Sequence, residues 1–483
     1  MNDYMFTLEE VLSACKGELY TPGSTDVCTP GVYISGVSKD TRTIAKDNLY
    51  IAIKGENFDG HDFIADAVSK GASAVLACNR SKVPSGVIAI IVEDTVAALG
   101  NLARYYRFKL GAKTVCVTGS VGKTSTREMI AAVLSSGSKC YSTKFNENNE
   151  IGMPMTILSA PLDTETLVLE LGMRLKGEIS YLTNIACPDI AVITTVGYSH
   201  IERLGSQENI RDAKCEIIEG LVDGGILIVN GDDRKLVKHV EEIIPINNIV
   251  ASVSVSGHNS DLPAEAFAEN IIFEHTGGVT FDANVRRLDD LVKLDKVSLK
   301  LNGIHNVRNA LVALLCGAIL HIPSGKAVEA LGKYEQPRGR GQVHFTKRFI
   351  VIDDAYNASP ESMEAAFGNL SVIGQGKRRI AVLGGMLELG DYAKQLHNKV
   401  GRTLGGYGFD TLFVTGDESD DLIEGVRQND KKIEIIKCDN TADVKEKLTG
   451  YVKDGDVLLF KASHSFGFEK LAADFAAIGE GNE

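Results

Sequence analysis

The sequence predicts an α/β protein of about three domains built on mostly parallel sheets, and three observations support this fold class. The chain has 483 residues, which is too long for one hydrophobic core. Short runs of apolar and β-branched residues alternate with longer amphipathic stretches, a pattern typical of parallel sheets with helices on both faces. A glycine-rich loop separates one such run from the helix predicted after it.

The glycine-rich loop lies within residues 113–125, whose sequence is KTVCVTGSVGKTS. Residues 115–117 are short, apolar and mostly β-branched, which predicts a buried strand. Residues 123–134 predict a helix. Gly119 and Gly122 allow the backbone between them to turn tightly and to approach a ligand closely.

This arrangement predicts a phosphate-binding loop. Backbone N–H groups and the positive end of the helix attract an anion, and Lys123 adds a charge. The Thr124 hydroxyl is suited to hold Mg²⁺. The common pattern has a glycine where Val117 stands, so an ordinary strand-to-helix turn is the alternative.

Composition excludes several classes of protein. The net charge of −13 disfavours general nucleic-acid binding. No apolar run is long enough to cross a bilayer, and the N-terminus lacks the apolar segment of a signal peptide. The nine cysteines are scattered without a Cys-x-x-Cys pair, which favours reduced core thiols and a cytoplasmic location over a metal site or disulfides.

Residues 1–108 are expected to form a small α/β N-terminal domain. Thr7, followed by Glu10, predicts a capped helix over 6–12. Strands are expected at 49–53, 74–76 and 88–92, and a helix at 63–71. The hydroxyls and Arg42 of segment 38–42, beside the polar loop 54–61, could bind a phosphorylated ligand, and a solvated turn is the alternative.

Residues 109–335 are expected to form the central domain, with a P-loop-type, mostly parallel sheet. Strands are predicted at 167–171, 190–195 and 226–230, and helices at 210–221 and 306–320. The polar segment 254–265 is expected to be a surface loop. Ligands of such sheets gather at the carboxyl ends of the strands, where the informative polar residues of this segment also stand.

Five of these polar residues are candidates for a site, and each also has an ordinary structural explanation. Glu170 ends a strand and could bind a metal or form a structural ion pair. His200 could be a surface or hydrogen-bonded histidine, and Lys214 a solvated lysine. Asn306 and Asn309 share one helix face and could recognise a base edge or stabilise the start of the helix.

Residues 336–483 are expected to form a third, Rossmann-like α/β domain. Strands are predicted at 349–352, 379–383, 412–414 and 457–460, with helices between them, including 360–370 and 391–404. The polar loops 337–340, 353–360, 384–390 and 461–465 fall at strand ends or just before strands, where a substrate site is expected. Arg340 could clamp a phosphate with two hydrogen bonds, or be a surface arginine.

Several strings resemble the Mur ligases, the ATP-dependent amide-forming enzymes of peptidoglycan precursor synthesis. They are TGSVGKT at 118–124, NENNEIGMP at 146–154, Glu170-Leu-Gly, His200 together with Lys214, and GIHNVRN at 303–309. The resemblance covers essentially the whole chain in the family's three-domain order. It implies an N-terminal domain that binds a UDP-linked substrate, a central ATPase domain and a C-terminal domain that binds the incoming group.

Further strings are similar to the branch of the family that adds D-alanyl-D-alanine: DDAYNASP at 353–360, GMLELG at 385–390 and NFDGH at 57–61. The Asp-Asn-Pro-Arg loop of the members that add the third amino acid does not occur in this sequence. Four positions depart from the family pattern. Gly385 stands where the family usually has aspartate, Ala462 where it has glycine, His464 where it has arginine, and Thr41 where serine is common.

The resemblance implies an ATP site and two Mg²⁺ sites. Residues that would contact ATP are Thr118, Gly119, Ser120, Val121, Gly122, Lys123, Thr124, Ser125, Asn306, Asn309, Arg340 and Asp354. Thr124 and Glu170 would bind one Mg²⁺, and His200 with a carbamylated Lys214 would serve a second. The catalytic set would be Lys123, Glu170, His200, Lys214 and Arg340.

The resemblance also implies the two other substrates. The UDP-muramoyl tripeptide would be held by Ser38, Asp40, Thr41, Arg42, Asn57, Asn146 and Asn149. The D-alanyl-D-alanine dipeptide would lie near Asp353, Tyr356, Asn357 and Ser463. We expect a cytoplasmic monomer that makes an acyl phosphate from ATP and the tripeptide carboxylate, and then an amide. The alternatives are another amide ligase of this fold, such as a folylpolyglutamate synthase or the third-residue-adding enzyme, and a non-catalytic nucleotide-binding scaffold.

Overall fold

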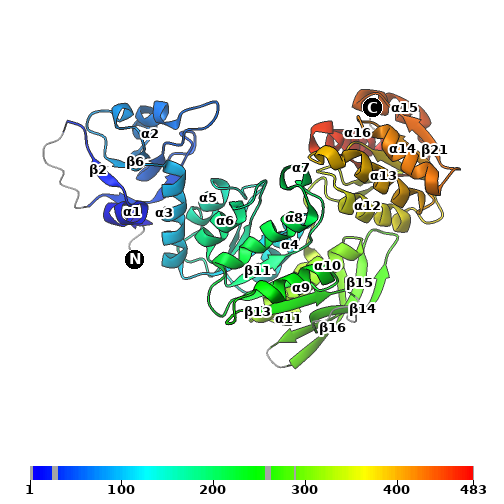
Figure 1. Cartoon of the computed structure of the whole chain (residues 1–483), viewed down its shortest axis with the longest axis horizontal. Helices are drawn as coiled ribbons and strands as arrows, with labels where there is room; N and C mark the ends of the chain where they lie inside the picture. The colour runs from blue at the N-terminus through cyan, green and yellow to red at the C-terminus, as the bar shows by residue number, and fades with distance from the viewer. Residues whose placement is uncertain (1–3, 24–30, 256–262, 288–289, 482–483) are drawn as a thin grey trace.

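The computed structural model describes residues 4–23, 31–255, 263–287 and 290–481, and it shows three α/β units in a row (Figure 1). The N-terminal unit, drawn in blue, lies at one end and the C-terminal unit, drawn in yellow to red, at the other. The predicted fold class, three α/β domains with mostly parallel sheets, is confirmed. Within the described residues, no helix is both long and apolar enough to cross a membrane.

The N-terminal unit contains a five-stranded sheet in the order β2-β7-β6-β5-β4. Its strands are β2 (Glu18–Tyr20), β4 (Gly36–Ser38), β5 (Asn48–Ile51), β6 (Ala72–Ala77) and β7 (Ala89–Ile91), with α2 (Ile64–Ser69) beside them and a β1–β3 ladder (Phe6–Thr7 with Tyr33–Ile34). Helix α1 (Leu8–Cys15) begins with the predicted capping box. The Thr7 side chain accepts a hydrogen bond from the Glu10 amide, and the Glu10 side chain accepts one from Thr7.

Helix α3 (Thr95–Leu110) connects the first two units. Asp94 caps its start and Gly111, with φ of 64°, ends it. The helix packs against α1 on one side and against α5 (Gly152–Leu158) and α6 (Glu178–Ala186) of the central unit on the other, as Figure 1 shows. It therefore ties the N-terminal sheet to the central one.

The central unit is organised around β8 (Lys113–Thr118), which carries the glycine loop at its carboxyl end. Both faces of this strand are buried: Val115 and Val117 pack with the α4 and α10 side of the core, and Cys116 packs with the α3, α5 and α6 side. The sheet runs β16-β15-β14-β13-β12-β11-β8-β10-β9. The pairs from β9 to β14 are parallel, and the β14–β15 and β15–β16 pairs are antiparallel.

The other strands of this sheet are β9 (Cys140–Ser142), β10 (Thr166–Glu170), β11 (Ile190–Ile193), β12 (Ile226–Asn230), β13 (Ile249–Ser254), β14 (Ala264–Phe273), β15 (Val279–Arg287) and β16 (Asp290–Leu299). The helices are α4 (Lys123–Ser135), α7 (Ile201–Leu204), α8 (Gln207–Cys215), α9 (Arg234–Ile243), α10 (Ile304–Ile319) and α11 (Ser324–Lys333), besides α5 and α6. The helix predicted over 210–221 starts earlier, after the Ser206 cap, and a 3₁₀ turn follows from Glu216.

The antiparallel extension β14 to β16 was not predicted. Of the expected surface loop at 254–265, residues 256–262 lie outside the described part of the chain. Ser254 ends β13, and Ala264 begins β14. Strands β14 and β16 alternate buried and exposed side chains only partly, since many of their residues are polar, so the pattern gave a weak strand signal.

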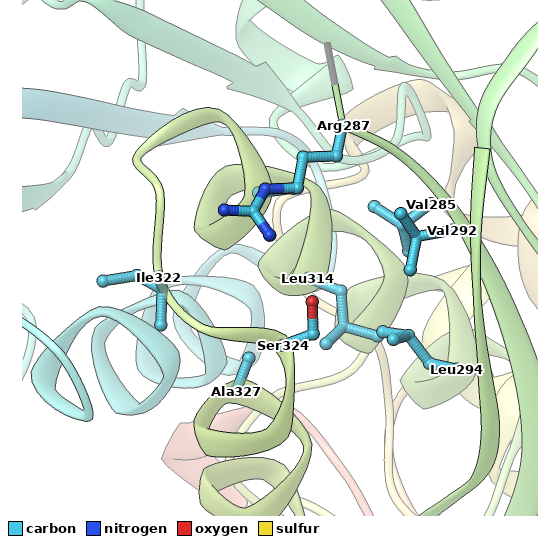
Figure 2. Close-up of a pocket in the computed structure, with 9 residues that line it drawn as sticks. Val285, Arg287, Val292, Leu294, Leu314, Ile322, Ser324 and Ala327 are labelled. Atoms are coloured by element: carbon cyan, nitrogen blue, oxygen red, sulfur yellow. The ribbon is translucent and has the colours of Figure 1, made fainter. Parts of the chain in front are cut away.

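A small cavity of about 10 Å³ lies between this extension and helices α10 and α11 (Figure 2). Val285 and Leu294 from the strands face Leu314 and Ala327 from the helices, and Arg287 lies across the rim. A space of this size holds about one water molecule. It is a packing gap and not a substrate site.

The C-terminal unit has a six-stranded sheet in the order β17-β18-β22-β19-β20-β21, parallel except for the β17–β18 pair. The strands are β17 (Gln342–Phe345), β18 (Ile350–Asp353), β19 (Arg379–Leu383), β20 (Thr411–Val414), β21 (Glu434–Lys437) and β22 (Val457–Lys461). The helices are α12 (Pro360–Ile373), α13 (Ala393–Gly405), α14 (Ser419–Asn429), α15 (Thr441–Tyr451) and α16 (Phe468–Glu480). All the strands and helices predicted for this unit are present, with ends shifted by a few residues.

The cysteines of the described residues are free, and the predicted absence of disulfides is confirmed there. Most of them are buried, whereas Cys78 is exposed and Cys140 is partly exposed. Burial raises the pKa of the Cys15 thiol to about 12, so this thiol is a core group and not a nucleophile. Cys28 lies outside the described residues.

Candidate functional site

A cavity of about 720 Å³ lies between the central and C-terminal units. Its walls come from the glycine loop and the start of α4, the end of β10, the first half of α10, and loops and helix α12 of the C-terminal unit. These are carboxyl ends of strands and amino ends of helices, where backbone amides point outward. The volume falls within the range of cofactor and small-ligand sites.

The glycine loop has the backbone conformation that its sequence predicts. Gly119 has φ of 150°, and a Cβ at this position would lie 1.9 Å from Thr194 Oγ1. Gly122 has φ of 86° and precedes the first residue of α4. The Ser120 amide donates to the Thr195 carbonyl at 2.7 Å, which fixes the loop to the end of β11. The loop is therefore rigidly held with its amides around the cavity.

Lys123 supplies a half-buried positive charge at this loop. Its ammonium donates a hydrogen bond to the Gly119 carbonyl at 2.8 Å. Burial, together with the nearby charge of Arg340, lowers the pKa of Lys123, while the Glu170 carboxylate opposes that shift. The site thus carries positive charge that an anionic ligand would neutralise.

Glu170 ends β10 and is almost completely buried. Its Oε1 accepts a hydrogen bond from Asn148 Nδ2 at 2.9 Å. Its Oε2 lies 3.9 Å from Nε of Arg127 and has no hydrogen-bond partner within the part of the chain that the structure describes. An unsatisfied buried carboxylate oxygen is costly, and a bound cation would satisfy it. The residues present therefore fit a metal ion here.

Lys214 and His200 do not line the cavity and come from the two neighbouring helices α8 and α7. Lys214 is buried, and no carboxylate of the described residues pairs with it. Burial, with the nearby Lys123 charge second, lowers its pKa far below the usual value, so the solvated lysine of the ordinary explanation is wrong. His200 has φ of 65°, and its Nδ1 lies 2.7 Å from Oε2 of Glu388 in the C-terminal unit.

The C-terminal wall of the cavity carries paired charges. The Arg340 guanidinium lies over the Tyr356 ring at 4.0 Å. Lys461 donates to Oδ2 of Asp354 at 2.7 Å and to the Asn357 carbonyl at 3.0 Å. Burial raises the pKa of Asp354 even though Lys461 opposes the shift.

Two further residues predicted for the dipeptide lie behind this wall. Asp353 is buried, and burial raises its pKa to about 6. Ser463 is buried, and its Oγ accepts a hydrogen bond from the Leu387 amide at 2.9 Å. Both side chains therefore shape the loops around the cavity in this arrangement of the units.

The asparagines of α10 differ in position. Asn309 lines the cavity and accepts a hydrogen bond from the Thr126 hydroxyl at 3.0 Å. Asn306 lies behind it, with its amide donating to the Asn302 carbonyl at 2.7 Å. In this arrangement Asn306 stabilises the start of the helix, as the alternative explanation allowed.

The residues predicted to hold the UDP-linked substrate divide between two regions. Asn146 lines the cavity, whereas the Asn149 side chain accepts a hydrogen bond at 2.8 Å from the amide of Gly152, the first residue of α5. The segment Ser38, Asp40, Thr41 and Arg42 follows β4 in the N-terminal unit, and Asn57 lies in an exposed loop of the same unit. Arg42 pairs with Asp40 at 2.6 Å and is largely exposed.

The cavity thus brings together most of the predicted ATP-binding residues, namely Ser120, Val121, Gly122, Lys123, Thr124, Ser125, Asn309, Arg340 and Asp354, along with Glu170, Asn146, Tyr356 and Asn357. Thr118 is buried beneath it and donates to the Leu171 carbonyl at 3.0 Å. Asn148, His305 and Glu361 also line the cavity and were not predicted. Asn148 belongs to the NENNEIGMP string at 146–154, but the spacing of that string did not indicate a hydrogen bond to Glu170.

Models of three families of domains match the chain. The Mur ligase middle domain matches residues 117–317, the Mur ligase glutamate ligase domain matches 339–464, and the Mur ligase family catalytic domain matches 33–107. The chain belongs to the Mur ligase family. It is therefore an ATP-dependent amide-forming ligase, and the suspected resemblance is confirmed.

Two curated relatives of this Mur ligase carry the same name. The UDP-N-acetylmuramoyl-tripeptide--D-alanyl-D-alanine ligase of Bacillus subtilis (strain 168) is 35% identical over 97% of this chain and 98% of its own length. The ligase of the same name from Escherichia coli (strain K12) is 32% identical over 86% of each chain.

Solved structures give the same result. A MurF crystal structure from Acinetobacter baumannii has a TM-score of 0.85 and 28% identity, with 98% of each chain covered. MurF of Thermotoga maritima in complex with ADP has a TM-score of 0.78 and 28% identity, covering 92% of this chain and 98% of that one. A folylpolyglutamate synthase of Mycobacterium tuberculosis, with a TM-score of 0.61 and 16% identity, shares the fold alone.

Proposed function

We propose that this Mur ligase joins D-alanyl-D-alanine to UDP-N-acetylmuramoyl-tripeptide, forming the pentapeptide precursor of peptidoglycan with release of ADP and phosphate. The relatives and solved structures that match nearly the whole chain carry this activity in their names. The observation that carries the proposal is the partly buried, positively charged glycine loop facing Arg340 and Asp354 across one cavity. Such a cavity brings an ATP phosphate and a carboxylate acceptor together.

ATP is proposed to bind with its phosphates on the amides of 119–125. Lys123 and Arg340 would contact the phosphates, Asn306 and Asn309 the adenine, and Asp354 the ribose. Asn306 would reach adenine only after leaving its hydrogen bond to Asn302. The chain's own groups would act by binding and orienting the γ-phosphate and by offsetting the repulsion between two anions.

Mg²⁺ is proposed to bind at Thr124 and Glu170, because the buried, unsatisfied Oε2 of Glu170 is available as a ligand. When bound, the ion would neutralise phosphate charge and activate the phosphorus for attack. A second Mg²⁺ is proposed near His200 and Lys214. The buried, unpaired Lys214 favours the neutral amine, the form that can react with CO₂ to give a carbamate, and a carbamate oxygen is a ligand that Mg²⁺ prefers.

The reaction is proposed to run in two steps. The tripeptide's terminal carboxylate attacks the γ-phosphorus, and the resulting acyl phosphate is then attacked by the free amine of the dipeptide. Water must be excluded from the acyl phosphate, and the three units are proposed to close around it. The pairing of His200 with Glu388 shows that the C-terminal unit already contacts the central one near the site.

The remaining assignments are also proposals. Residues 1–108 would bind the UDP end through Ser38, Asp40, Thr41, Arg42 and Asn57, residues 109–335 would bind ATP, and residues 336–483 would bind the dipeptide. Asn146 and Asn149 would guide the tripeptide, and Asp353, Tyr356, Asn357 and Ser463 would surround the dipeptide. We propose a cytoplasmic monomer that binds no nucleic acid and does not enter the membrane.

A donor and acceptor panel tests the proposal. Purified protein with ATP and Mg²⁺ is given UDP-muramoyl tripeptide or dipeptide donors, with D-alanyl-D-alanine, diaminopimelate, lysine or glutamate as acceptors, and phosphate release is measured. We expect release only with the tripeptide and D-alanyl-D-alanine. Release with a dipeptide donor and a single amino acid would identify the third-residue-adding activity, release with a folate donor and glutamate would identify a folylpolyglutamate synthase, and no release from any pair would favour a scaffold.

A further inference from the structure

Glu361 is a carboxylate of the cavity wall that no role above explains. It stands in the first turn of α12, in the C-terminal unit, and reaches the loop after β11 in the central unit. Its Oε1 accepts a hydrogen bond from the Tyr198 amide at 3.0 Å. Its Oε2 is buried and has no hydrogen-bond partner among the described residues. Gly197 makes this approach possible, because a Cβ there would lie 2.5 Å from Oε1.

The same loop connects Glu361 to the phosphate-binding loop. The Gly197 amide donates to Oγ of Ser120 at 2.9 Å, and the Ser199 hydroxyl donates to the Ser120 carbonyl at 3.3 Å. Glu361 therefore stands beside the end of the cavity where the loop of 119–125 would hold a terminal phosphate. A carboxylate beside phosphates is repelled unless a cation separates them.

Two other carboxylates of the cavity, Asp354 and Glu170, have a cationic neighbour, whereas Glu361 has no ion-pair partner among the described residues. Asp354 pairs with Lys461 at 2.7 Å, and Glu170 lies 3.9 Å from Arg127. Among the described residues, no lysine, arginine or histidine forms an ion pair with Glu361. Burial raises the pKa of Glu361, while hydrogen bonds from its own backbone amide, Ser359 and the Tyr198 amide oppose that shift, and the charge of Lys399 opposes it least. The carboxylate is suited to a cation that arrives with a substrate.

We propose that Glu361 binds the ammonium group of the incoming dipeptide and takes one of its protons. This inference rests on the proposed function, in which the dipeptide is the one substrate that carries a free ammonium next to the reacting atoms. The proposal adds Glu361 to the dipeptide residues of the C-terminal unit and places the nucleophile on the central-unit side of the cavity, beside Ser120.

The step balances as follows. One ammonium proton passes to Oε2 of Glu361, and the freed nitrogen lone pair forms the C–N bond to the acyl carbon. The C–O bond to the phosphoryl group breaks, and phosphate leaves with its electron pair. A second proton of the nitrogen leaves with the phosphate, and the amide keeps the third.

Glu361→Gln tests this assignment because the amide keeps an oxygen for the Tyr198 hydrogen bond and loses only the charge. The variant is assayed with ATP, Mg²⁺ and UDP-muramoyl tripeptide, using two nucleophiles in parallel. D-Alanyl-D-alanine arrives as an ammonium, whereas hydroxylamine is uncharged at neutral pH and traps an acyl phosphate as a hydroxamate. We expect kcat/KM for the dipeptide to fall roughly 10- to 100-fold, the cost of losing a charged hydrogen bond. Hydroxamate formation should stay unchanged.

Two further variants complete the experiment. Glu424→Gln makes the same change at an exposed position of α14 and should leave both rates unchanged. Glu361→Asp keeps the charge and should recover part of the dipeptide rate. An equal loss with both nucleophiles would overturn the inference, as would an unchanged dipeptide rate. If the unmutated protein gave no hydroxamate at all, the proposed function itself would fail, and the inference with it.

Discussion

The phosphate-binding loop of the central unit and the polar segment 38–42 of the N-terminal unit are both proposed to bind phosphates, yet they are built differently. Around the central loop, Lys123 is half-buried, and Glu170 at the end of β10 has an oxygen with no hydrogen-bond partner among the described residues. In the N-terminal segment, Arg42 pairs with Asp40, and the Ser38 hydroxyl donates to the Asp40 carbonyl at 2.9 Å. The central region holds charged groups whose hydrogen-bonding atoms are partly unsatisfied, whereas the N-terminal segment pairs its charged groups with one another.

This difference indicates where the chemistry takes place. Uncompensated buried charge costs stability and is retained where a ligand or a transition state supplies the opposite charge. Exposed groups that pair with one another change the stability of the protein little. We expect such groups to contribute to substrate affinity and not to the catalytic rate. Substitutions in the central loop should therefore change the rate, and those in the N-terminal segment should change only substrate affinity.

Lys123→Ala should have the largest effect. Removing the half-buried ammonium takes away a charge that stabilises phosphoryl transfer, and we expect ADP formation to fall by about 1,000-fold or more. The free energy of unfolding should hardly change, because removing the ammonium also removes the penalty of desolvating it on folding. Lys113→Ala, at an exposed position of the preceding strand, is the control and should keep full activity. Retained activity in Lys123→Ala would favour the scaffold alternative.

Gly119→Ala should damage the same loop through its backbone. The new Cβ would meet Thr194 Oγ1 at 1.9 Å, at a φ of 150° that disfavours alanine. We expect a loss of about 2–4 kcal/mol in unfolding free energy, together with weaker ATP binding by calorimetry. Gly111→Ala also has positive φ but open space around it, and it should cost only about 1 kcal/mol. Equal losses in the two variants would show that the contact with Thr194 is not important.

Asp353→Asn should raise stability while lowering activity. The folded-state pKa of about 6 exceeds the ordinary value of 3.8, so the folded protein binds the proton more tightly than the unfolded chain. Below pH 4 the group is protonated in both states and does not affect the free energy of unfolding. As the pH rises from 4 to 6, ionisation lowers the free energy of unfolding progressively, and the loss remains at higher pH. Denaturant unfolding at pH 8 should show a gain on the order of 1–3 kcal/mol, and at pH 4 none. Asp456→Asn removes a buried aspartate that pairs with Arg378, and it should destabilise the protein instead.

Arg42→Ala should have the smallest effect. Its side chain is largely exposed and pairs only with Asp40, so the melting temperature should not change. If the segment binds the UDP end, KM for the tripeptide donor should rise roughly 3- to 10-fold at unchanged kcat. Arg80→Ala removes another exposed arginine of the same unit and is the control. A fall in kcat with Arg42→Ala would contradict the division between the two regions.

Much of the fold follows from the sequence because apolar runs and caps are local signals. The Thr7–Glu10 capping box and the strand over 226–230 were predicted to the residue. The antiparallel strands β14 to β16 were missed, since their pairing with one another depends on contacts distant in sequence and their exposed faces are polar.

Some residues of the site could likewise be predicted from local sequence, and others could not. The loop amides and Lys123 could be predicted because their geometry is local to one strand, turn and helix. Asn148, Arg127 and Glu361 could not, because each acquires its significance from a partner brought near by the fold: Glu170 for the first two, and the Tyr198 amide for the third. The sequence around Lys214 indicated a solvated lysine, but the fold buries this side chain.

Helix α3 sets the distance between the N-terminal unit and the central unit, and this distance limits the length of donor that the enzyme can use. Its 16 residues span about 24 Å without a break, and the helix packs against the N-terminal unit on one side and against the central unit on the other. If the N-terminal unit binds the UDP end of the donor, as proposed, this helix holds that end at a constant distance from the phosphate-binding loop. Inserting four residues into it would push the first unit outward by about 6 Å, and a donor chain of the present length would then fall short of the phosphoryl group.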